Sequence, residues 1–319
     1  MKIIFMGTPE FAVESLDILV KNNYDIVGVI TVPDKPAGRG QQLHQSAVKK
    51  YALEKGLTIL QPEKLKDETF LNQLRELKAD LQIVVAFRML PEVVWNMPPM
   101  GTVNLHGSLL PQYRGAAPIN WAIINGETET GVSTFFLQQE IDTGKIIFRE
   151  KTPINETDDA ETIHDRLMHI GASLILKTVQ AIEKNDYPQT DQSILIGENE
   201  EIKTAPKIFK EDCAINFNRP LHQVYNFIRG LSPYPAAHTT LCAPDGKQIS
   251  LKIFKCTKEP MHIDFSPGSI STDSKTYLKI ACTDGYLSVT DLQLAGKKRM
   301  LTGDFLRGFP MDTNWKTLI

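Results

Sequence analysis

Short apolar runs alternate with stretches of helical periodicity over the first half of the chain. Lys2–Met6 is a nearly continuous apolar run, which predicts a strand buried on both faces. Thr8 is then placed as an N-cap and Pro9 as the first helical residue. The alternation predicts a Rossmann-like, doubly wound, mostly parallel sheet. Further strands are predicted at 25–31, 81–86, 102–105, 132–137 and 145–149, and helices at 46–55, 69–78 and 160–183. Asp158 and Glu161 are placed like a capping box before the last of these helices.

The pattern changes in the second half. A polar stretch at 189–207 predicts a linker, and a helix at 221–229 ends at Gly230. Alternating strands follow, separated by turn pairs such as Asp245-Gly246 and Asp284-Gly285. Five short strands predict a smaller OB-like β-barrel, so we expect domains at 1–188 and 208–319. These strands are predicted at 237–242, 247–255, 268–272, 278–282 and 286–293.

The composition is that of a globular protein of two domains. The chain has 319 residues, of which 42% are hydrophobic and 23% are charged. No apolar run approaches the roughly 20 residues that span a bilayer, and the N-terminal run is too short for a secretory signal. We therefore expect a cytoplasmic protein. The cysteines are too widely spaced for a zinc site and are expected to be small buried thiols. They are Cys213, Cys242, Cys256 and Cys282.

Charge is unevenly distributed along the chain. Residues 203–319 hold 16 Lys and Arg against 10 Asp and Glu, whereas residues 1–202 hold 19 against 28. Such an asymmetry favours an anionic partner for the C-terminal part. A solvated basic face would produce the same balance, so the charge alone leaves both interpretations open.

The turn after the first strand excludes one class of function. Only one glycine, Gly7, follows that strand, so the Gly-x-Gly-x-x-Gly fingerprint of dinucleotide-binding proteins is absent. The chain also lacks a Gly-Lys-Ser/Thr phosphate loop. A nicotinamide-dependent dehydrogenase is therefore not expected.

Asn104 and His106 lie two residues apart at the end of a predicted strand, so both side chains project from one face. The carboxyl ends of parallel strands are where open α/β sheets bind ligands. An asparagine amide could bind a carbonyl oxygen, and a histidine could move the proton of an attacking amine. By spacing alone, an asparagine that caps a turn beside a histidine at the edge of the core is the favoured alternative.

Asp142-Thr143-Gly144 lies between two predicted strands. By itself this triplet favours a turn, because Asp bonds its own backbone and Gly accepts a positive φ. An Asp-Thr-Gly triplet is also typical of aspartic proteases, which need two such carboxylates. The chain has one such triplet, so that function is excluded.

Together these segments resemble the folate-dependent N-formyltransferases. The similarity rests on Asn104-x-His106, on Ser108-Leu109-Leu110-Pro111 with Gly115, and on Asp142-Thr143-Gly144. The resemblance implies that Asn104, His106 and Asp142 are catalytic and that 10-formyltetrahydrofolate is the formyl donor. No metal is expected, since that donor is already activated. The folate contacts that the resemblance implies are Ser108, Leu109, Leu110, Pro111, Phe87 and Arg88.

The resemblance covers nearly the whole chain and is closest to members that formylate methionine carried by initiator tRNA. It implies a monomer in which the OB-like domain holds tRNA. Two departures are Arg88, where the family often has Gly, and Lys203–Lys207, where relatives commonly show Tyr before the Ala. The tRNA contacts that it implies are Lys35, Arg39, Lys297, Lys298 and Arg299. The matching segments are 7–12, 32–40, 115–119, 232–236 and 296–300.

Two other functions remain as alternatives at this stage. Formyl transfer to a small amine, such as a purine precursor or an amino sugar, would use the same Asn104, His106 and Asp142. It would leave the basic second domain and the segment 32–40, which contains Arg39, without a role. A non-catalytic RNA-binding protein would leave the three catalytic candidates without one. The resemblance does not decide whether His106 binds the formyl oxygen or accepts the amine proton.

Overall fold

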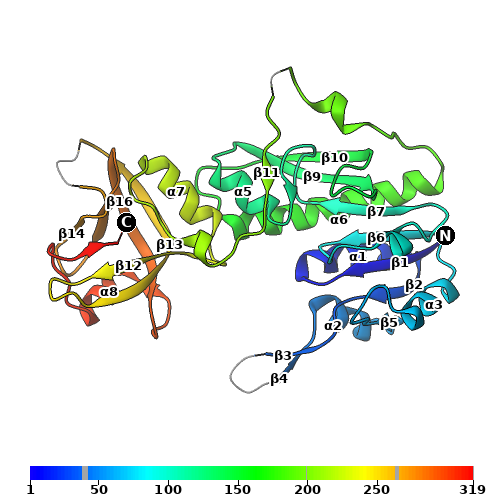
Figure 1. Cartoon of the computed structure of the whole chain (residues 1–319), viewed down its shortest axis with the longest axis horizontal. Coiled ribbons are helices and arrows are strands. Elements are labelled where there is room, and N and C mark those ends of the chain that lie inside the picture. The colour runs from blue at the N-terminus through cyan, green and yellow to red at the C-terminus, as the bar shows by residue number, and fades with distance from the viewer. Residues whose placement is uncertain (38–41, 199, 263–265, 319) are drawn as a thin grey trace. The chain divides into compact units, whose positions relative to one another are not determined.

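A seven-stranded sheet carries the first part of the chain, in the strand order β10-β9-β7-β6-β1-β2-β5 (Figure 1). The ladders β1–β2, β1–β6, β6–β7 and β2–β5 are parallel, and β7–β9 is antiparallel. This confirms the mostly parallel, Rossmann-like sheet. The strands are β1 (Lys2–Gly7), β2 (Asp25–Ile30), β5 (Ile59–Leu60), β6 (Leu81–Val85), β7 (Thr102–His106), β9 (Glu129–Phe136) and β10 (Ile146–Pro153).

Helices and short hairpins connect these strands. The structure is a computed structural model, and it describes residues 1–37, 42–198, 200–262 and 266–318. In this part of the chain the connecting elements are α1 (Glu10–Lys21), β3 (Lys35–Ala37), β4 (Gln42–His44), α2 (Ala47–Glu54), α3 (Glu68–Glu76), α4 (Glu92–Trp95), β8 (Arg114–Gly115), α5 (Pro118–Ile124), α6 (Ala160–Glu183), η1 (Gln192–Leu195) and β11 (Thr204–Ala205).

The strand order creates a switch point beside β1. The chain leaves β1 through α1 to reach β2 on one side, whereas β6 lies on the other side of β1. The carboxyl ends of β1, β6 and β7 therefore meet at one edge, at Gly7, Val85 and His106. Ligands bind in the crevice at this edge of open α/β sheets.

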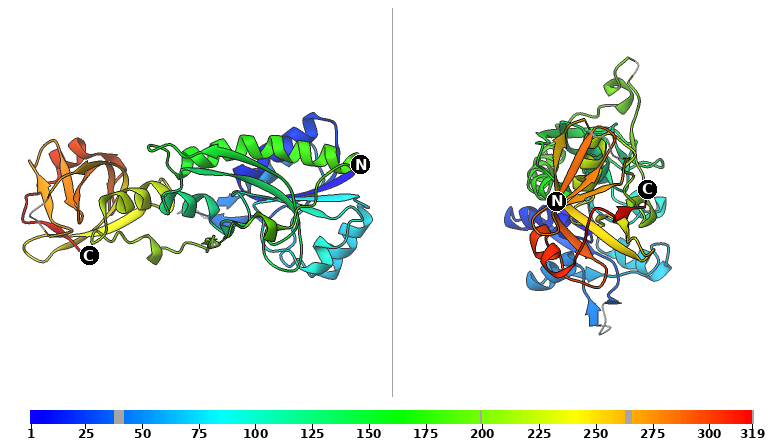
Figure 2. Two further views of the ribbon diagram at one scale, coloured as in Figure 1. Left: turned by 90° about the horizontal axis from the view of Figure 1, so that it is seen from above. Right: turned by 90° about the vertical axis from the view of Figure 1, so that its left-hand side faces the viewer.

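Helix α6 covers one face of the antiparallel side of the sheet (Figure 2). A Cβ on Gly171 would lie 2.7 Å from the Leu105 side chain, so this helix packs closely on β7. Thr178 shares a hydrogen bond with Thr134 of β9. Because neighbouring residues of a strand alternate between faces, the side chains of Asn104 and His106 project from the face that α6 does not cover.

Helix boundaries agree with the periodicity, but two predicted caps were wrong. Pro9 is the N-cap of α1 and makes no side-chain cap bond, so Thr8 is one residue too early. Before α6, the Asp159 carboxylate accepts from the Thr162 backbone N–H (2.9 Å), a capping role that was predicted for Asp158. Asp158 instead accepts from the backbone N–H of Asn155.

The C-terminal part forms an antiparallel sheet that closes on itself. Its strands follow the order β14-β15-β16-β13-β12-β18, and a bridge between Ser269 and Lys316 joins the two ends. This confirms the OB-like β-barrel. The elements are η2 (Glu211–Cys213), α7 (Leu221–Gly230), β12 (Ala237–Cys242), β13 (Gln248–Pro260), β14 (Ile270–Thr272), β15 (Leu278–Ala281), β16 (Gly285–Leu294), β17 (Met300–Leu301), α8 (Thr302–Gly308) and β18 (Lys316–Thr317).

The barrel has its own apolar core. Phe217, Leu251, Ile253 and Leu287 are fully buried in it, and α7 packs Ile228 against the same cluster. All four cysteines are free; Cys213, Cys256 and Cys282 are buried as expected, whereas Cys242 is half-buried. Burial raises the pKa of Cys282 to about 12.

The chain divides into two compact units. Unit 1 comprises 1–118, 129–152 and 164–204, and unit 2 comprises 119–128, 153–163 and 205–319. Two segments from the first half of the chain thus belong with the barrel. The domain bounds 1–188, 189–207 and 208–319 stay a prediction. No helix in the described part of the chain has the length and apolarity that crossing a membrane requires.

Candidate active site

Asn104 and His106 occupy the end of β7, on the face that α6 leaves open. His106 is buried, and Asn104 is half-buried. The Asn104 amide makes no hydrogen bond to any other described residue. An amide without a protein partner at the carboxyl edge of a sheet can donate to a carbonyl oxygen of a ligand.

The His106 ring is held by a backbone carbonyl. Its Nε2 lies 2.8 Å from the carbonyl oxygen of Tyr113. Since a carbonyl oxygen only accepts, Nε2 must carry a hydrogen and donate it. Tyr113 has a positive φ of 61°, and its backbone N–H donates to the Lys203 carbonyl at 2.7 Å. In the neutral ring, Nδ1 is therefore the nitrogen that can accept a proton.

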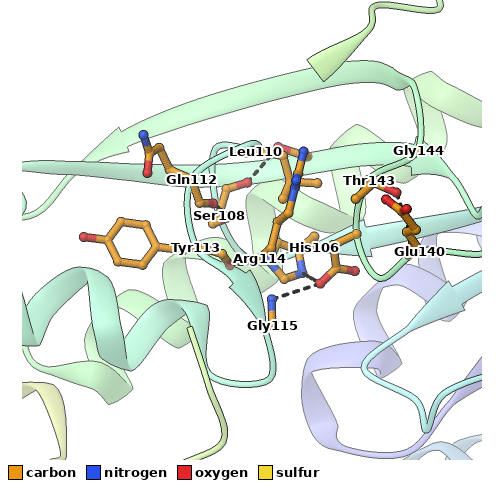
Figure 3. A network of polar contacts seen from close by, with 12 residues as sticks. His106, Ser108, Leu110, Gln112, Tyr113, Arg114, Gly115, Glu140, Thr143 and Gly144 are labelled. Carbon is orange, nitrogen blue, oxygen red and sulfur yellow. Dashed lines mark hydrogen bonds and ion pairs between the residues drawn. The ribbon is translucent and has the colours of Figure 1, made fainter. Parts of the chain in front are cut away.

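Asp142 faces that nitrogen. Figure 3 shows His106 above Gly115, with Thr143 and Gly144 of the neighbouring loop beside them. Its Oδ2 lies 3.8 Å from Nδ1 of His106, which is beyond hydrogen-bond distance. The same oxygen accepts from the backbone N–H of Gly115 at 3.0 Å. The carboxylate is thus fixed by the backbone after Arg114, close enough to the imidazole to stabilise a positive charge on it but not hydrogen-bonded to it.

The loop that carries Asp142 is tightly constrained. Asp142 has a φ of 55°, a left-handed conformation that aspartate tolerates better than most residues. A Cβ on Gly144 would lie 1.7 Å from the carbonyl oxygen of Phe136, so only glycine fits there. The predicted Asp-Thr-Gly turn is therefore present, and it places the carboxylate beside His106.

The segment Ser108–Pro111 is folded back against β9. Ser133 Oγ donates to the Ser108 carbonyl (2.7 Å) and accepts from the Leu110 backbone N–H (3.0 Å). The side chains of Ser108, Leu110 and Pro111 are buried, whereas Leu109 is half-exposed. Of the predicted folate contacts in this segment, Leu109 alone offers an accessible side chain.

Phe87 and Arg88 follow β6. Phe87 packs against the apolar cluster that includes Val84 and Leu90. The Arg88 guanidinium donates to the backbone carbonyls of Glu63 (2.8 Å) and Pro62, and burial lowers its pKa from the ordinary value. It therefore already serves to hold a neighbouring loop.

The predicted tRNA contacts are dispersed along the chain. Lys35 is exposed on β3, and Arg39 lies outside the described residues. Lys297 and Lys298 are exposed in the turn between β16 and β17, and neither forms an ion pair with another described residue. Arg299 instead donates from Nε and Nη2 to the Asp291 carboxylate, with Nη2···Oδ2 at 2.7 Å. The charges of the two lysines are therefore available to a ligand, whereas the charge of Arg299 is already paired with Asp291.

Three residues of the site were not predicted. Tyr113 acts through its backbone carbonyl, which no side-chain pattern indicates. Ser133 of β9 holds the 108–110 segment through its hydroxyl. It pairs with His106 across the β7–β9 ladder, and this pairing would have pointed to it had the strand register been known. Gln192 binds the Asp142 loop from 50 residues further along the chain. Among the described residues, no group of three or more His, Cys, Asp or Glu side chains is arranged to hold a metal ion.

Comparison with known proteins identifies the family. The formyl transferase model matches residues 1–179, and the model of the formyl transferase C-terminal domain matches residues 207–310. A methionyl-tRNA formyltransferase from Parabacteroides distasonis is 59% identical over 97% of this chain and 96% of its own length. A methionyl-tRNA formyltransferase from Bacteroides thetaiotaomicron is 57% identical over 99% of this chain and 98% of its own length.

Solved structures share the fold at low sequence identity. An N-formyltransferase from Helicobacter canadensis, in complex with folinic acid and dTDP-3-aminofucose, has a TM-score of 0.63 at 23% identity. This match covers 94% of this chain and 100% of that one. HypX from Aquifex aeolicus, in complex with tetrahydrofolic acid, has a TM-score of 0.62 at 17% identity, over 96% and 47% of the two chains. From the two family models and the curated relatives, the chain belongs to the formyl transferase family and, within it, to the methionyl-tRNA formyltransferases.

Proposed function

We propose that this enzyme transfers the formyl group of 10-formyltetrahydrofolate to the α-amine of methionine on initiator tRNA. It would act as a monomer in the cytoplasm, for translation initiation. The observation that carries the chemistry is the grouping of Asn104, His106 and Asp142 at the carboxyl edge of the sheet. The acceptor follows from relatives named methionyl-tRNA formyltransferase that are 50–59% identical to this chain.

The amide of Asn104 is proposed to bind the formyl oxygen. As the amine attacks, negative charge develops on that oxygen, and a donor already in place stabilises it without reorganisation. Such a donor contributes about 3–4 kcal/mol to the transition state. The lack of a protein partner for this amide among the described residues supports the role, because a ligand oxygen would satisfy it.

His106 is proposed to accept the proton of the attacking amine at Nδ1. Its Nε2 is already engaged by the Tyr113 carbonyl, so Nδ1 is the nitrogen open to substrate. Asp142, 3.8 Å from Nδ1, would stabilise the imidazolium that forms. The new N–C bond replaces the bond from the formyl carbon to N10, and the proton passes from His106 to N10. The products are formylmethionyl-tRNA and tetrahydrofolate.

The folate supplies a formyl group on N10 that is already activated for transfer. Leu109, half-exposed after β7, is the side chain of the 108–111 segment that can contact it. The buried Ser108 and Leu110 would contribute backbone shape, and Phe87 would contribute the packed wall after β6. Arg88 would act indirectly, since its guanidinium holds the Pro62 and Glu63 carbonyls.

The tRNA is proposed to meet basic residues of both units. Lys35 lies on β3 and Lys297 and Lys298 lie in the β16–β17 turn, whereas Arg39 is outside the described residues. Phosphate contacts of this kind position a nucleic acid without reading its sequence. Arg299 is the weaker candidate, because Asp291 already neutralises it.

Formyl transfer with a labelled donor tests the acceptor. We expect transfer to charged initiator tRNA to be faster than transfer to free methionine, glycinamide ribotide or a nucleotide-linked amino sugar by at least about 10³-fold in kcat/KM, because the enzyme would use binding energy from the tRNA body. Preferred transfer to one of the small amines would replace this proposal with the alternative function. No transfer to any of them would refute both.

Substitution of the three proposed catalytic residues tests the mechanism. Asn104→Ala, His106→Ala and Asp142→Asn should each lower kcat about 10²-fold or more, and the double variants should lose much less than the product of the single effects. Folate binding, followed by the protein's tryptophan fluorescence, should persist in all three. A His106→Ala enzyme with near-normal kcat would remove His106 from the mechanism.

A further inference from the structure

Gln192 is a nearly fully buried polar side chain in a segment predicted to be a linker. It begins the short helix η1, within residues 189–198, which we call the strap. Its exposed fraction is 2%. Burying an amide costs free energy unless its hydrogen-bonding groups are satisfied, so the partners of this side chain indicate why it is there.

All four hydrogen-bonding positions of the Gln192 amide are used. Nε2 donates to the carbonyl oxygens of Asp142 and Gly144, each at 2.8 Å. Oε1 accepts from Nε (3.0 Å) and Nη2 (2.6 Å) of Arg114. The opposite orientation would place Oε1 against two carbonyls and the NH₂ group against a guanidinium. These partners therefore determine the orientation of the amide.

The Gln192 amide joins the two segments that hold the Asp142 carboxylate. On one side it binds the backbone of the loop at Asp142 and Gly144. On the other side it binds Arg114, whose neighbour Gly115 donates its backbone N–H to Asp142 Oδ2. Loss of this amide would release both segments, and the direction of the carboxylate toward His106 would no longer be fixed.

The strap itself is anchored independently of Gln192. Thr190 pairs with Ile146 of β10 through two backbone hydrogen bonds of 2.8 and 2.9 Å. Leu195 packs against the cluster of Leu110, Phe135 and Ile146. The strap would therefore stay in place without the amide, so a substitution of Gln192 acts on the loop more than on the fold of the strap.

We propose that Gln192 is a positioning residue for formyl transfer, which acts by holding Asp142 at its working place beside His106. This inference rests on the role proposed above for Asp142. A displacement of about 1 Å at a catalytic group can cost on the order of 10²-fold in rate. Gln192→Glu tests it most sharply, because a carboxylate of the same shape keeps the interaction with Arg114 but opposes the two carbonyls.

We expect Gln192→Glu to lower kcat about 10- to 100-fold, with the KM for 10-formyltetrahydrofolate changed by less than about threefold. Gln192→Met, of similar length but without polar groups, should likewise lower kcat and leave the KM for 10-formyltetrahydrofolate nearly unchanged. It carries the test if the Glu variant does not fold. Ser193→Ala is the matched control. Ser193 lies in the same helical turn and bonds Asp191, so its substitution should leave kcat within about twofold.

A double-mutant cycle with Asp142→Asn separates positioning from a general structural role. If Gln192 acts through Asp142, the Gln192→Glu effect on kcat should largely disappear in the Asp142→Asn background. Additive losses, or a lower melting temperature with unchanged kcat, would overturn the inference, and so would failure of both Gln192 variants to fold. If Asp142→Asn itself keeps the normal kcat, the proposed role of Asp142 fails first. If Asp142→Asn loses activity and Gln192→Glu does not, only this inference fails.

Discussion

His106 has one nitrogen engaged and the other facing a carboxylate across a gap. Nε2 donates to the Tyr113 carbonyl, and Nδ1 lies 3.8 Å from Asp142. A protonated Nδ1 cannot accept the amine proton. We therefore predict that kcat/KM for formyl transfer falls in acid, where the proton acceptor of the reaction is lost. A profile of kcat/KM between about pH 5 and 8 measures this.

The amine of the substrate also becomes protonated in acid, and a variant separates the two causes. In His106→Gln, the residual kcat/KM should still fall in acid because the amine becomes protonated. The part of the fall that is due to the imidazole should be absent. Identical profiles for the two enzymes would show that His106 does not accept the proton.

Gly144 tests how closely the Asp142 loop must follow β9. A Cβ there would lie 1.7 Å from the Phe136 carbonyl oxygen, so Gly144→Ala forces the loop to move. Because that loop carries Asp142 and is held by Gln192, we predict a loss of about 10²-fold in kcat. Stability should fall by about 1–3 kcal/mol, as is typical when extra atoms enter a well-packed site. Steady-state kinetics and denaturant unfolding measure both effects.

Gly246→Ala is the control for this substitution. Gly246 has a φ of 86°, but nothing lies within 4 Å of an added Cβ. The backbone strain should cost about 1 kcal/mol of stability and leave kcat unchanged. A normal kcat in Gly144→Ala would mean that the loop tolerates displacement, and this would also weaken the positioning role of Gln192.

At the scale of single residues, side-chain spacing predicted that Asn104 and His106 share one face of a strand, and the structure places them on the face that α6 does not cover. Their catalytic role comes from the family motif and stays a proposal, because spacing alone favours a turn cap beside a histidine at the edge of the core. Asp142 could be assigned only through the family motif, since its triplet by itself favours a turn. Tyr113 and Gln192 were missed because one acts through its backbone and the other through partners 48 to 78 residues distant in sequence.

At the scale of elements, hydrophobic periodicity predicted the sheet, the barrel and the long helix α6, whose bounds match the prediction. The errors lie where side chains compete for one role. Pro9 holds the N-cap position of α1, which was predicted for Thr8. The Asp159 carboxylate caps α6, a role that was predicted for Asp158. Strand β13 runs to Pro260, beyond the predicted 255, because its ladder with β16 continues to Gly285. Apolar pattern alone does not reveal such pairing.

The segment 153–163 joins unit 2 through Arg229 of α7. Its Nη1 donates to the backbone carbonyls of Asn155 (3.1 Å) and Asp158 (2.7 Å), and its Nε donates to the side chain of Asn226. Burial lowers the pKa of this guanidinium from its ordinary value. Arg229→Met would remove the donor from the buried bond to the Asp158 carbonyl and from the partly buried bond to Asn155, so we predict a loss of about 2–5 kcal/mol in the stability of unit 2.

Urea unfolding followed by fluorescence measures this loss, and Arg219→Met is the control. Arg219 lies on the exposed surface just before α7, so its substitution should change the free energy of unfolding by less than about 0.5 kcal/mol. Equal effects of the two substitutions would show that the buried bonds of Arg229 do not hold the 153–163 segment.

At the scale of the whole molecule, the folded units revise the charge argument. Unit 2 includes residues 119–128 and 153–163, which add five acidic side chains and no basic ones. By its sequence, unit 2 therefore holds 15 Lys and Arg and 15 Asp and Glu. Glu156 pairs with Lys258 at 2.6 Å, and Asp291 pairs with Arg299. Unit 2 therefore has no net positive charge to attract a nucleic acid, and the tRNA contact proposed for it would depend on exposed local lysines.

Lys297 and Lys298 are the clearest test of that conclusion. Both are exposed in the β16–β17 turn, whereas the adjacent Arg299 is bound by Asp291 and stacks over the Phe254 ring at 4.2 Å. If they bind phosphates, Lys297→Gln with Lys298→Gln should weaken all tRNAs alike and lower the slope of log Kd against log salt by roughly 0.7–0.9 for each phosphate that is no longer neutralised. The double variant Lys247→Gln with Lys275→Gln removes two exposed turn charges elsewhere in unit 2 and should keep the slope. A wild-type slope in the Lys297/Lys298 variant would make this turn a solvated tip that plays no part in tRNA binding.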